Sequence, residues 1–371
     1  MSWSGMRGIS PIPTYVVMQP TTLCNLDCTY CYLPFRAQDR RMTVEVAQHV
    51  AASVNAWAGG YPANGRFSVV WHGGEPMAAG RAALAQLMAP FAGVEHHIQT
   101  NATLVDDAWC DFFVEHGVRV SVSVDGPPEL NEQRVNRAGA PAYRGIIRGI
   151  ETLRRRGLPF SALCVVSTPQ PGMAERLYEY FLDLGCDVLG INIEEQEGVN
   201  ARANAFAPEA VRTFWAELVG AWRRAPRIHV REIEWTLRYA GAVLDDAADA
   251  VLPRTLDPIP TVAADGRVFL LSPELAGFTD VHYGDFSSGN VLDEPLSSIL
   301  LGAATSASWV PEYLAGVEAC RTGCPYFGFC GGAHAANRYF EHGRFDGTET
   351  NHCRNSKIRL LEGVLDHAGA R

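Results

Sequence analysis

The chain has 371 residues, of which 47% are hydrophobic and 19% are charged, and its formal net charge is −10 at pH 7. These values predict one α/β barrel, or a barrel with a small second domain, around a sizeable core. The negative charge argues against nucleic-acid binding. No long apolar run or signal-peptide pattern is present, so we expect no membrane partner and a cytoplasmic location.

Short apolar runs alternate with amphipathic helical patterns through the first two thirds of the chain. The predicted strands cover residues 14–19, 66–72, 96–100, 118–125, 160–167 and 188–194. The predicted helices cover residues 43–58, 79–92, 106–116, 142–156 and 173–185, several of them stopped by Gly93, Gly117, Gly157 or Gly185. This alternation predicts an α/β fold, a partial (β/α)6 barrel of the TIM type with a parallel sheet inside and helices outside, whose core covers about residues 14–230.

The composition and the predicted secondary structure of the chain change in its last third. Residues 200–252 are predicted to be helical and to bridge two parts of the protein. After Pro253, proline and glycine are frequent, strands are short (267–271) and cysteines reappear. We therefore expect a barrel domain with bridging helices over 1–250 and a second domain with a C-terminal helix over 251–371.

Polar or glycine-rich motifs follow four successive predicted strands. They are the cluster of Cys24, Cys28 and Cys31, the run Gly73-Gly74-Glu75-Pro76, Asn101, and Asp125-Gly126. Because chemistry in such barrels gathers at the carboxyl ends of the strands, these motifs predict one site.

The ten cysteines form two groups and three solitary residues. A disulfide framework is not expected in a reducing compartment. Cys110, Cys164 and Cys186 stand alone, and we interpret them as core or surface thiols.

The first group, Cys24, Cys28 and Cys31, supplies three thiolates from one short loop. Three ligands suit a [4Fe–4S] cluster with one open iron. Thiolates also bind zinc, but a structural zinc site needs a fourth ligand nearby, and the nearest histidine is His49. The spacing favours iron–sulfur, with zinc as the alternative.

The stretch LCNLDCTYCY resembles the signature loop of the radical S-adenosylmethionine (SAM) superfamily, and so does the Gly-Gly-Glu-Pro run after the second strand. The resemblance implies that the open iron binds SAM, whose reductive cleavage gives a 5′-deoxyadenosyl radical that abstracts a substrate hydrogen. The glycines would let the backbone approach the SAM ammonium, and Glu75 would offset its charge. The residues that the resemblance assigns to SAM are Tyr30, Gly73, Gly74, Glu75, Pro76, Asn101, Ser123 and Arg134. The alternative for each is a turn, a cap or a surface position.

The second group, Cys320, Cys324, Cys330 and Cys353, could hold zinc or a closed [4Fe–4S] cluster. Residues 255–360 resemble the SPASM extension of radical SAM peptide maturases. Full SPASM domains hold two auxiliary clusters, but the cysteines expected near Thr261 and Leu271 are absent here, and His334 stands where another cysteine is usual. The resemblance implies one auxiliary cluster on these four cysteines, two [4Fe–4S] clusters in all, and a structural role for His334.

Three short segments resemble the maturases of glycine-rich repeat peptides, whose relatives form cyclophanes. These segments are residues 272–275, residues 289–291 and the run CPYFGFCGGAHAANRYF. They imply a ribosomal precursor peptide as substrate, a carbon–carbon bond between an aromatic ring and a β-carbon, and flavodoxin or ferredoxin as low-potential electron donor. Anaerobic sulfatase maturases carry a catalytic aspartate where this chain has LLSPE, which disfavours sulfatase-type oxidation; Glu274 is the nearest candidate proton acceptor. Epimerisation, thioether formation and a zinc-stabilised binding protein remain alternatives.

Overall fold

The computed structural model describes residues 8–60, 67–202, 205–247 and 255–369. Its centre is a ten-stranded sheet with the order β10-β9-β8-β1-β2-β3-β4-β5-β6-β7. The strands β1 to β6 span Tyr15–Met18, Ser68–Trp71, Glu95–Thr100, Val118–Ser123, Phe160–Val166 and Val188–Ile193. Each pairs in parallel with the next, so their carboxyl ends share one edge of the sheet, as the alternating pattern predicted.

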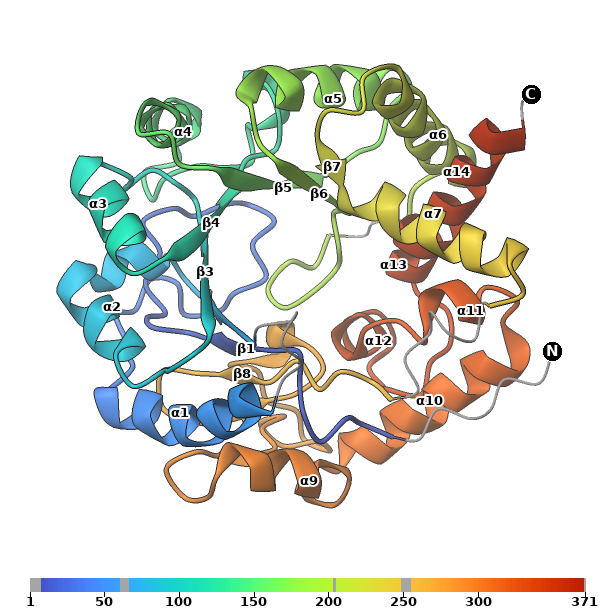
Figure 1. Cartoon of the computed structure of the whole chain (residues 1–371). Coiled ribbons are helices and arrows are strands. Elements are labelled where there is room, and N and C mark those ends of the chain that lie inside the picture. The colour runs from blue at the N-terminus through green and yellow to red at the C-terminus, as the bar shows by residue number, and fades with distance from the viewer. Residues whose placement is uncertain (1–7, 61–66, 203–204, 248–254, 370–371) are drawn as a thin grey trace.

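Helices cover the outside of this sheet (Figure 1). The helices α1 to α5 span Val44–Gly59, Arg81–Met88, Asp107–Glu115, Tyr143–Arg155 and Met173–Leu184. Their inner faces are apolar because residues three or four apart lie on one side of a helix. In α4, for example, Ile146, Ile150 and Leu153 are all fully buried.

Glycines explain where some helices begin and end. Gly117, Gly157 and Gly185 have φ values of 60°, 66° and 80° and follow α3, α4 and α5, as predicted. The helix predicted over 79–92 is shorter than expected at both ends. It ends at Met88, so the prediction that Gly93 stops it is wrong. Gly80, at φ 87°, separates a 3₁₀ turn, η1 (Pro76–Ala79), from α2.

The region 200–252 is not helical throughout. It contains α6 (Pro208–Arg224), α7 (Arg231–Leu244) and a short strand between them, β7 (His229–Val230), which pairs in parallel with β6. Pro226 follows the end of α6 and cannot donate a backbone hydrogen bond, which gives a local reason for the break. The domain boundary predicted near residue 250 lies outside the described residues.

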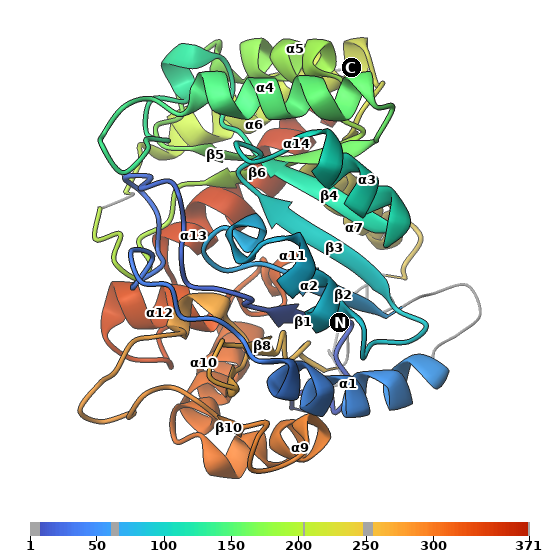
Figure 2. The same cartoon turned by 90° about the vertical axis from the view of Figure 1, so that its left-hand side faces the viewer.

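The C-terminal segment extends the sheet beyond β1. β8 (Thr261–Val262) pairs in parallel with β1, and β9 (Arg267–Phe269) and β10 (Gly289–Asn290) follow in antiparallel pairs. Both views show β8 beside β1 (Figures 1 and 2). The later helices α9 to α14 span Leu296–Ser306, Trp309–Gly323, Phe327–Cys330, Ala335–His342, Asn351–Cys353 and Arg359–Gly369. The short turns are η2 (Pro128–Leu130), η3 (Pro273–Leu275) and the π-helical η4 (Arg354–Ile358).

The last helix closes onto the barrel. A Cβ at Gly363 would lie 2.6 Å from the Arg212 carbonyl oxygen, so α14 packs tightly on α6 only because this residue is glycine. The indole Nε1 of Trp215 donates to the Asn355 carbonyl oxygen at 2.9 Å. None of the helices in the described ranges is long and apolar enough to cross a membrane.

The solitary cysteines are part of the core. Cys110, Cys164 and Cys186 are 0%, 0% and 2% exposed and sit among apolar side chains. This confirms their interpretation as thiols of the folded interior rather than ligands, and it leaves the two cysteine groups for the chemistry of the site.

Candidate active site

The three cysteines of the first group lie on the loop after β1 and line one cavity of about 300 Å³. Burial, together with the nearby Glu75 charge, raises the pKa of Cys24 to about 12, and burial raises that of Cys28 to about 11. Both thiols therefore keep their protons until a metal displaces them. Among the described residues, no three His, Cys, Asp or Glu side chains are drawn together tightly enough to hold a metal ion. The fit to an iron–sulfur cluster rests on three soft thiols that share one cavity.

The glycine loop after β2 packs directly against the cysteine loop. A Cβ at Gly74 would collide with the Leu23 carbonyl oxygen, and Gly73 has a φ of 129° that favours glycine. The Glu75 amide donates to the Leu23 carbonyl oxygen at 2.8 Å. The two glycines are thus required for the two loops to meet, and the loop lines the same cavity as the cysteines.

The carboxylate of Glu75 is buried and bound by the protein itself. It accepts hydrogen bonds from Thr100 Oγ1 at 2.8 Å, from the Asn101 amide at 2.8 Å and from the Met77 amide at 3.1 Å. Burial raises its pKa to about 7, although these hydrogen bonds oppose the shift. Glu75 therefore connects the loops after β2 and β3, a structural role that the sequence did not reveal. Its contact with SAM stays a prediction.

Arg134 is paired within the protein too. Its guanidinium makes two parallel hydrogen bonds of 2.9 Å to Asp125, and Tyr30 donates its hydroxyl to the same carboxylate at 2.6 Å. The guanidinium carbon lies 5.4 Å from the centre of the Tyr30 ring. Tyr30 and Arg134 line the cavity and are held in place by an aspartate at the end of β4.

Asn101 and Ser123 line the cavity between these groups. The Asn101 side-chain amide donates to Asn25 at 2.9 Å and lies 3.8 Å from the Cys24 sulfur. Ser123 Oγ accepts a hydrogen bond from Gln99 at 2.7 Å. All the residues predicted to contact SAM, except Pro76, are thus among those that line the cavity of the three cysteines.

A carboxylate-rich wall also lines this cavity. Glu274, in η3, has one carboxylate oxygen buried and without a hydrogen-bond partner among the described residues. Burial, with a further contribution from the Glu195 charge, raises the pKa of Glu274 to about 7. The hydroxyl of Tyr32 hydrogen-bonds His72 at 2.9 Å, and burial lowers the His72 pKa to about 4, so this imidazole is neutral.

Glu195 and Glu197, which follow β6, complete the wall. The Asn337 side-chain amide donates to both, at 2.7 Å and 2.6 Å. Burial and the Glu195 charge raise the pKa of Glu197 well above its ordinary range. Burial acts on Glu195 in the same sense, but the His352 charge outweighs it and holds the Glu195 pKa at about 2. Within this pair, Glu197 therefore holds a proton more readily than Glu195 does.

These two glutamates were not predicted as site residues. They follow the sixth predicted strand, and the rule that chemistry gathers at strand ends could have pointed to them. Glu274 was predicted, and the structure places it on this wall, in the cavity of Cys24, Cys28 and Cys31. A carboxylate is therefore present here, which removes the reason given above for disfavouring sulfatase-type oxidation.

The second cysteine group lies on the helices after β10. Cys320 and Cys324 lie at the end of α10, Cys330 ends α11 and Cys353 ends α13. A hydrogen bond from Cys353 lowers the pKa of Cys330 to about 5. The same hydrogen bond raises the pKa of Cys353, and the charge of Cys324 raises it further. Cys320 interacts in turn with Cys324 and Cys330. Four thiols are the number that a closed cluster needs, and their role as its ligands stays a prediction.

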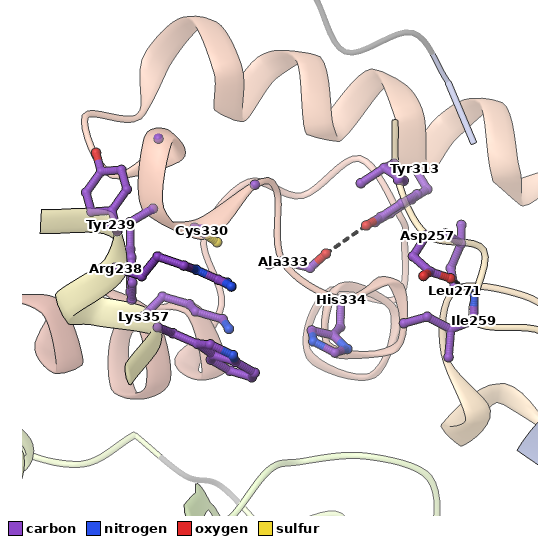
Figure 3. A pocket seen from close by; sticks show the side chains of 15 residues that line it. Arg238, Tyr239, Asp257, Ile259, Leu271, Tyr313, Cys330, Ala333, His334 and Lys357 are labelled. Carbon is purple, nitrogen blue, oxygen red and sulfur yellow. Dashed lines mark hydrogen bonds between the residues drawn. The ribbon is translucent and has the colours of Figure 1, made fainter. Parts of the chain in front are cut away.

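A second cavity, of about 320 Å³, reaches this group. Figure 3 shows Cys330, His334, Arg238 and Lys357 around it. Burial lowers the His334 pKa to about 3, so the ring is neutral, and it packs 5.3 Å from the ring of His352. His334 lies beside the cysteine group, but its role stays a prediction.

A sequence profile described as the radical SAM superfamily matches residues 18–170. The uncharacterized protein sll1766 of Synechocystis sp. is 30% identical over 366 residues, which cover 94% of this chain and 90% of that protein. The chain belongs to the radical SAM superfamily. It is therefore an enzyme, and iron–sulfur chemistry with SAM is its cofactor chemistry, as predicted.

The chain is also similar to radical SAM enzymes whose names state an activity. The serine-type anaerobic sulfatase-maturating enzyme of Klebsiella aerogenes is 31% identical over 233 residues, which cover 58% of this chain and 55% of that enzyme. The chain thus spans about half the length of this relative. The solved structure of native anSMEcpe with bound AdoMet (SAM) matches with a TM-score of 0.73 at 22% identity, covering 95% of this chain and 96% of that chain.

A further structural match is SuiB of Streptococcus suis bound to its precursor peptide SuiA. Its TM-score is 0.57 at 15% identity, covering 79% of this chain and 65% of that chain. At such identities the likeness concerns the fold. It confirms the predicted class, an α/β radical SAM barrel with a SPASM-type C-terminal domain.

Proposed function

We propose that this enzyme modifies a ribosomally made precursor peptide by joining an aromatic ring to the β-carbon of a nearby residue. The observation that carries the proposal is the single cavity that the cysteine loop shares with the wall of Glu195, Glu197 and Glu274. A radical source and a proton acceptor would then meet the same substrate. SuiB bound to a precursor peptide, and anSMEcpe bound to peptides, support a peptide as that substrate.

When bound, the cluster and SAM supply an organic radical that removes a hydrogen atom from an unactivated carbon. We assign the cluster to Cys24, Cys28 and Cys31. The residues assigned to SAM are Tyr30, Gly73, Gly74, Glu75, Pro76, Asn101, Ser123 and Arg134. Their part is positional: the buried Asp125–Arg134 pair and the Glu75 hydrogen bonds hold the walls of the cavity in one geometry before the substrate arrives.

The carboxylate wall takes the proton that the reaction releases. Joining the two carbons removes one hydrogen from each, and one SAM is converted to methionine and 5′-deoxyadenosine, which retains one of these hydrogens; the other leaves as a proton. Glu274 is our candidate acceptor, because its pKa of about 7 lets it both hold and release a proton near neutral pH. Glu197 is the weaker candidate, because burial and the Glu195 charge raise its pKa well above its ordinary range and favour its protonated form.

Cys320, Cys324, Cys330 and Cys353 would hold an auxiliary cluster, which would supply an acceptor for the electron that leaves with this proton. A fully ligated cluster suits electron transfer, since no iron is open for a substrate atom. Flavodoxin or ferredoxin would supply one electron at the start of the cycle and take one back at the end.

The test uses the full-length, cluster-loaded enzyme and synthetic precursors encoded by short reading frames next to its gene. With SAM and a low-potential reductant, the product should lose two hydrogens per modification. Tandem mass spectrometry should show no fragments between the aromatic residue and its partner, and proton spectra should show a substituted ring. An unchanged mass with deuterium at an α-carbon would contradict cross-linking and indicate epimerisation.

Sulfatase-type oxidation is a second candidate. It is favoured by the similarity to the serine-type sulfatase-maturating enzyme and by the carboxylate of Glu274 in the cavity. Oxidising a serine to an aldehyde also removes two hydrogens, so mass alone does not separate the two. An aldehyde-reactive hydrazide added to the product would decide: capture identifies this oxidation, and no capture together with a fragment-free gap identifies the cross-link.

A further inference from the structure

Arg338 is a fully buried cation beside the second cysteine group. It lies on α12, and its exposed fraction is 0%. Charged side chains are rarely this deeply enclosed unless an opposite charge accompanies them.

The surroundings of Arg338 are built to hold it against Cys320. Its Nη2 atom donates to the Cys320 sulfur at 3.4 Å and to the Gly332 carbonyl oxygen at 2.6 Å, and its Nη1 donates to the Phe345 carbonyl oxygen at 3.2 Å. Gly316, on α10, leaves the necessary space, because a Cβ there would collide with Nη1.

No carboxylate in the described ranges lies within ion-pair distance of this guanidinium. Its partners are backbone carbonyl oxygens, one sulfur and the Tyr313 ring, whose centre lies 5.1 Å from the guanidinium carbon. A buried charge without a counter-charge is costly. An iron–sulfur cluster on four thiolates carries a net negative charge, so its assembly at Cys320 would supply the missing anion.

We propose that Arg338 is a positioning residue that raises the reduction potential of the auxiliary cluster, so that the cluster accepts the electron released from the substrate. The inference rests on the proposed function, in which this cluster is the electron acceptor. Reduction adds one negative charge to the cluster. A fixed positive charge, and a hydrogen bond to a ligating sulfur, stabilise the reduced form more than the oxidised form.

The electron count is simple. As the substrate is oxidised, one electron reduces the cluster from [4Fe–4S]²⁺ to [4Fe–4S]⁺ and one proton goes to a carboxylate of the cavity. The electron then passes to a one-electron redox protein of the flavodoxin or ferredoxin class, which restores the oxidised cluster.

The experiment measures the potential of this cluster alone. A variant with Cys24, Cys28 and Cys31 all changed to Ala retains only the auxiliary cluster, which is titrated with reductant and followed by electron paramagnetic resonance. In that background Arg338→Gln should lower the ratio of reduced to oxidised cluster at least tenfold at a given potential, which lowers the reduction potential by at least about 59 mV for one electron. Arg338→Lys, which keeps the charge, should recover part of this shift.

Arg321→Gln is the matched control. Arg321 follows Cys320 directly, but it is paired with Glu318 and is partly exposed, so its removal should change the ratio less than threefold. An equal shift in both variants would mean that any nearby charge has the same effect, and an unchanged potential in Arg338→Gln would overturn the proposal outright. A preparation with zinc and no iron on these cysteines would overturn it too.

A second measurement covers the case in which Arg338 variants do not fold. The reduced cluster of the same triple-alanine background, containing ¹⁵N-arginine, should show a nitrogen coupling in pulsed resonance spectra, since a guanidinium donates to a ligating sulfur. Absence of that coupling refutes the contact. The potential is measured without substrate, so a shift found in an enzyme that forms no cross-link would uphold the role of Arg338 and reject only the proposed product.

Discussion

The carboxylate of Glu195 lies 3.0 Å from Nδ1 of His352, the residue immediately before Cys353. Glu195 lines the cavity of the first cysteine group, whereas His352 lies in α13, the short helix that carries the last cysteine of the second group. This contact lacks hydrogen-bond geometry and acts as an ion pair when His352 is protonated. It therefore connects the carboxyl end of β6 to α13 in the interior of the protein.

Removing this carboxylate should loosen the junction. Glu195→Ala is expected to lower the free energy of unfolding by about 1–3 kcal/mol, because the buried Asn337 amide would lose one of its two acceptors and His352 would lose the carboxylate beside it. Denaturant unfolding of the cluster-loaded enzyme under anaerobic conditions measures the change. Glu115→Ala, at an exposed position at the end of α3, serves as control and should leave the stability unchanged. Equal stability of both variants would show that the contacts of Glu195 with Asn337 and His352 do not stabilise the fold.

Gly74→Ala should disrupt the first cluster site. The new methyl group would collide with the Leu23 carbonyl oxygen and push the glycine loop away from Cys24. We expect at least a tenfold loss of SAM cleavage and a lower iron content, both measured after anaerobic reconstitution. Gly302→Ala, in α9, meets no atom within 4 Å and should behave like the unmodified enzyme. Normal cleavage in Gly74→Ala would mean that the loop tolerates the methyl group and that the close contact is unimportant.

The role of Glu274 predicts a pH profile. A base must be ionised, and with a pKa of about 7 only about one tenth of Glu274 is ionised at pH 6 and about nine tenths at pH 8. Peptide modification should therefore rise with pH across this interval. Glu274→Gln should slow modification at least tenfold and leave uncoupled SAM cleavage in place, while Glu294→Gln, at an exposed position, should alter neither. A profile that stays unchanged in Glu274→Gln would assign the proton to another group.

Metal content tests the assignment of both cysteine groups. We expect about eight iron and about eight sulfide per chain, from two four-iron clusters. Changing Cys24, Cys28 and Cys31 together to Ala should remove about half of each and abolish SAM cleavage. About twelve iron per chain would mean a third cluster, although cysteines are absent near Thr261 and Leu271. Zinc in place of iron would point instead to a structural metal protein.

Local patterns carried the prediction of the barrel. Apolar residues predicted β1 to β6. In β3, β4 and β5 buried residues alternate with less buried ones, because successive side chains of a strand point to opposite faces of the sheet. The glycines after α3, α4 and α5 marked helix ends because the left-handed conformation costs other residues more. The pattern failed at Gly80 and at β7, where a single residue or a two-residue strand interrupts a helical signal.

The sequence by itself also determined which loop is the candidate for the chemistry, because three cysteines spaced as Cys24, Cys28 and Cys31 are recognisable without tertiary context. Only the tertiary structure decided which distant residues lie beside the two cysteine groups and their cavities. Glu195 meets Asn337 and His352 across more than 140 residues of chain, and Arg338 reaches Cys320 from another helix. A periodic pattern reports which face of an element is apolar, whereas the partner of a buried charge depends on how distant elements pack. A glutamate or an arginine in a sequence is by default a surface residue, so burial against a specific partner becomes visible only in the folded chain.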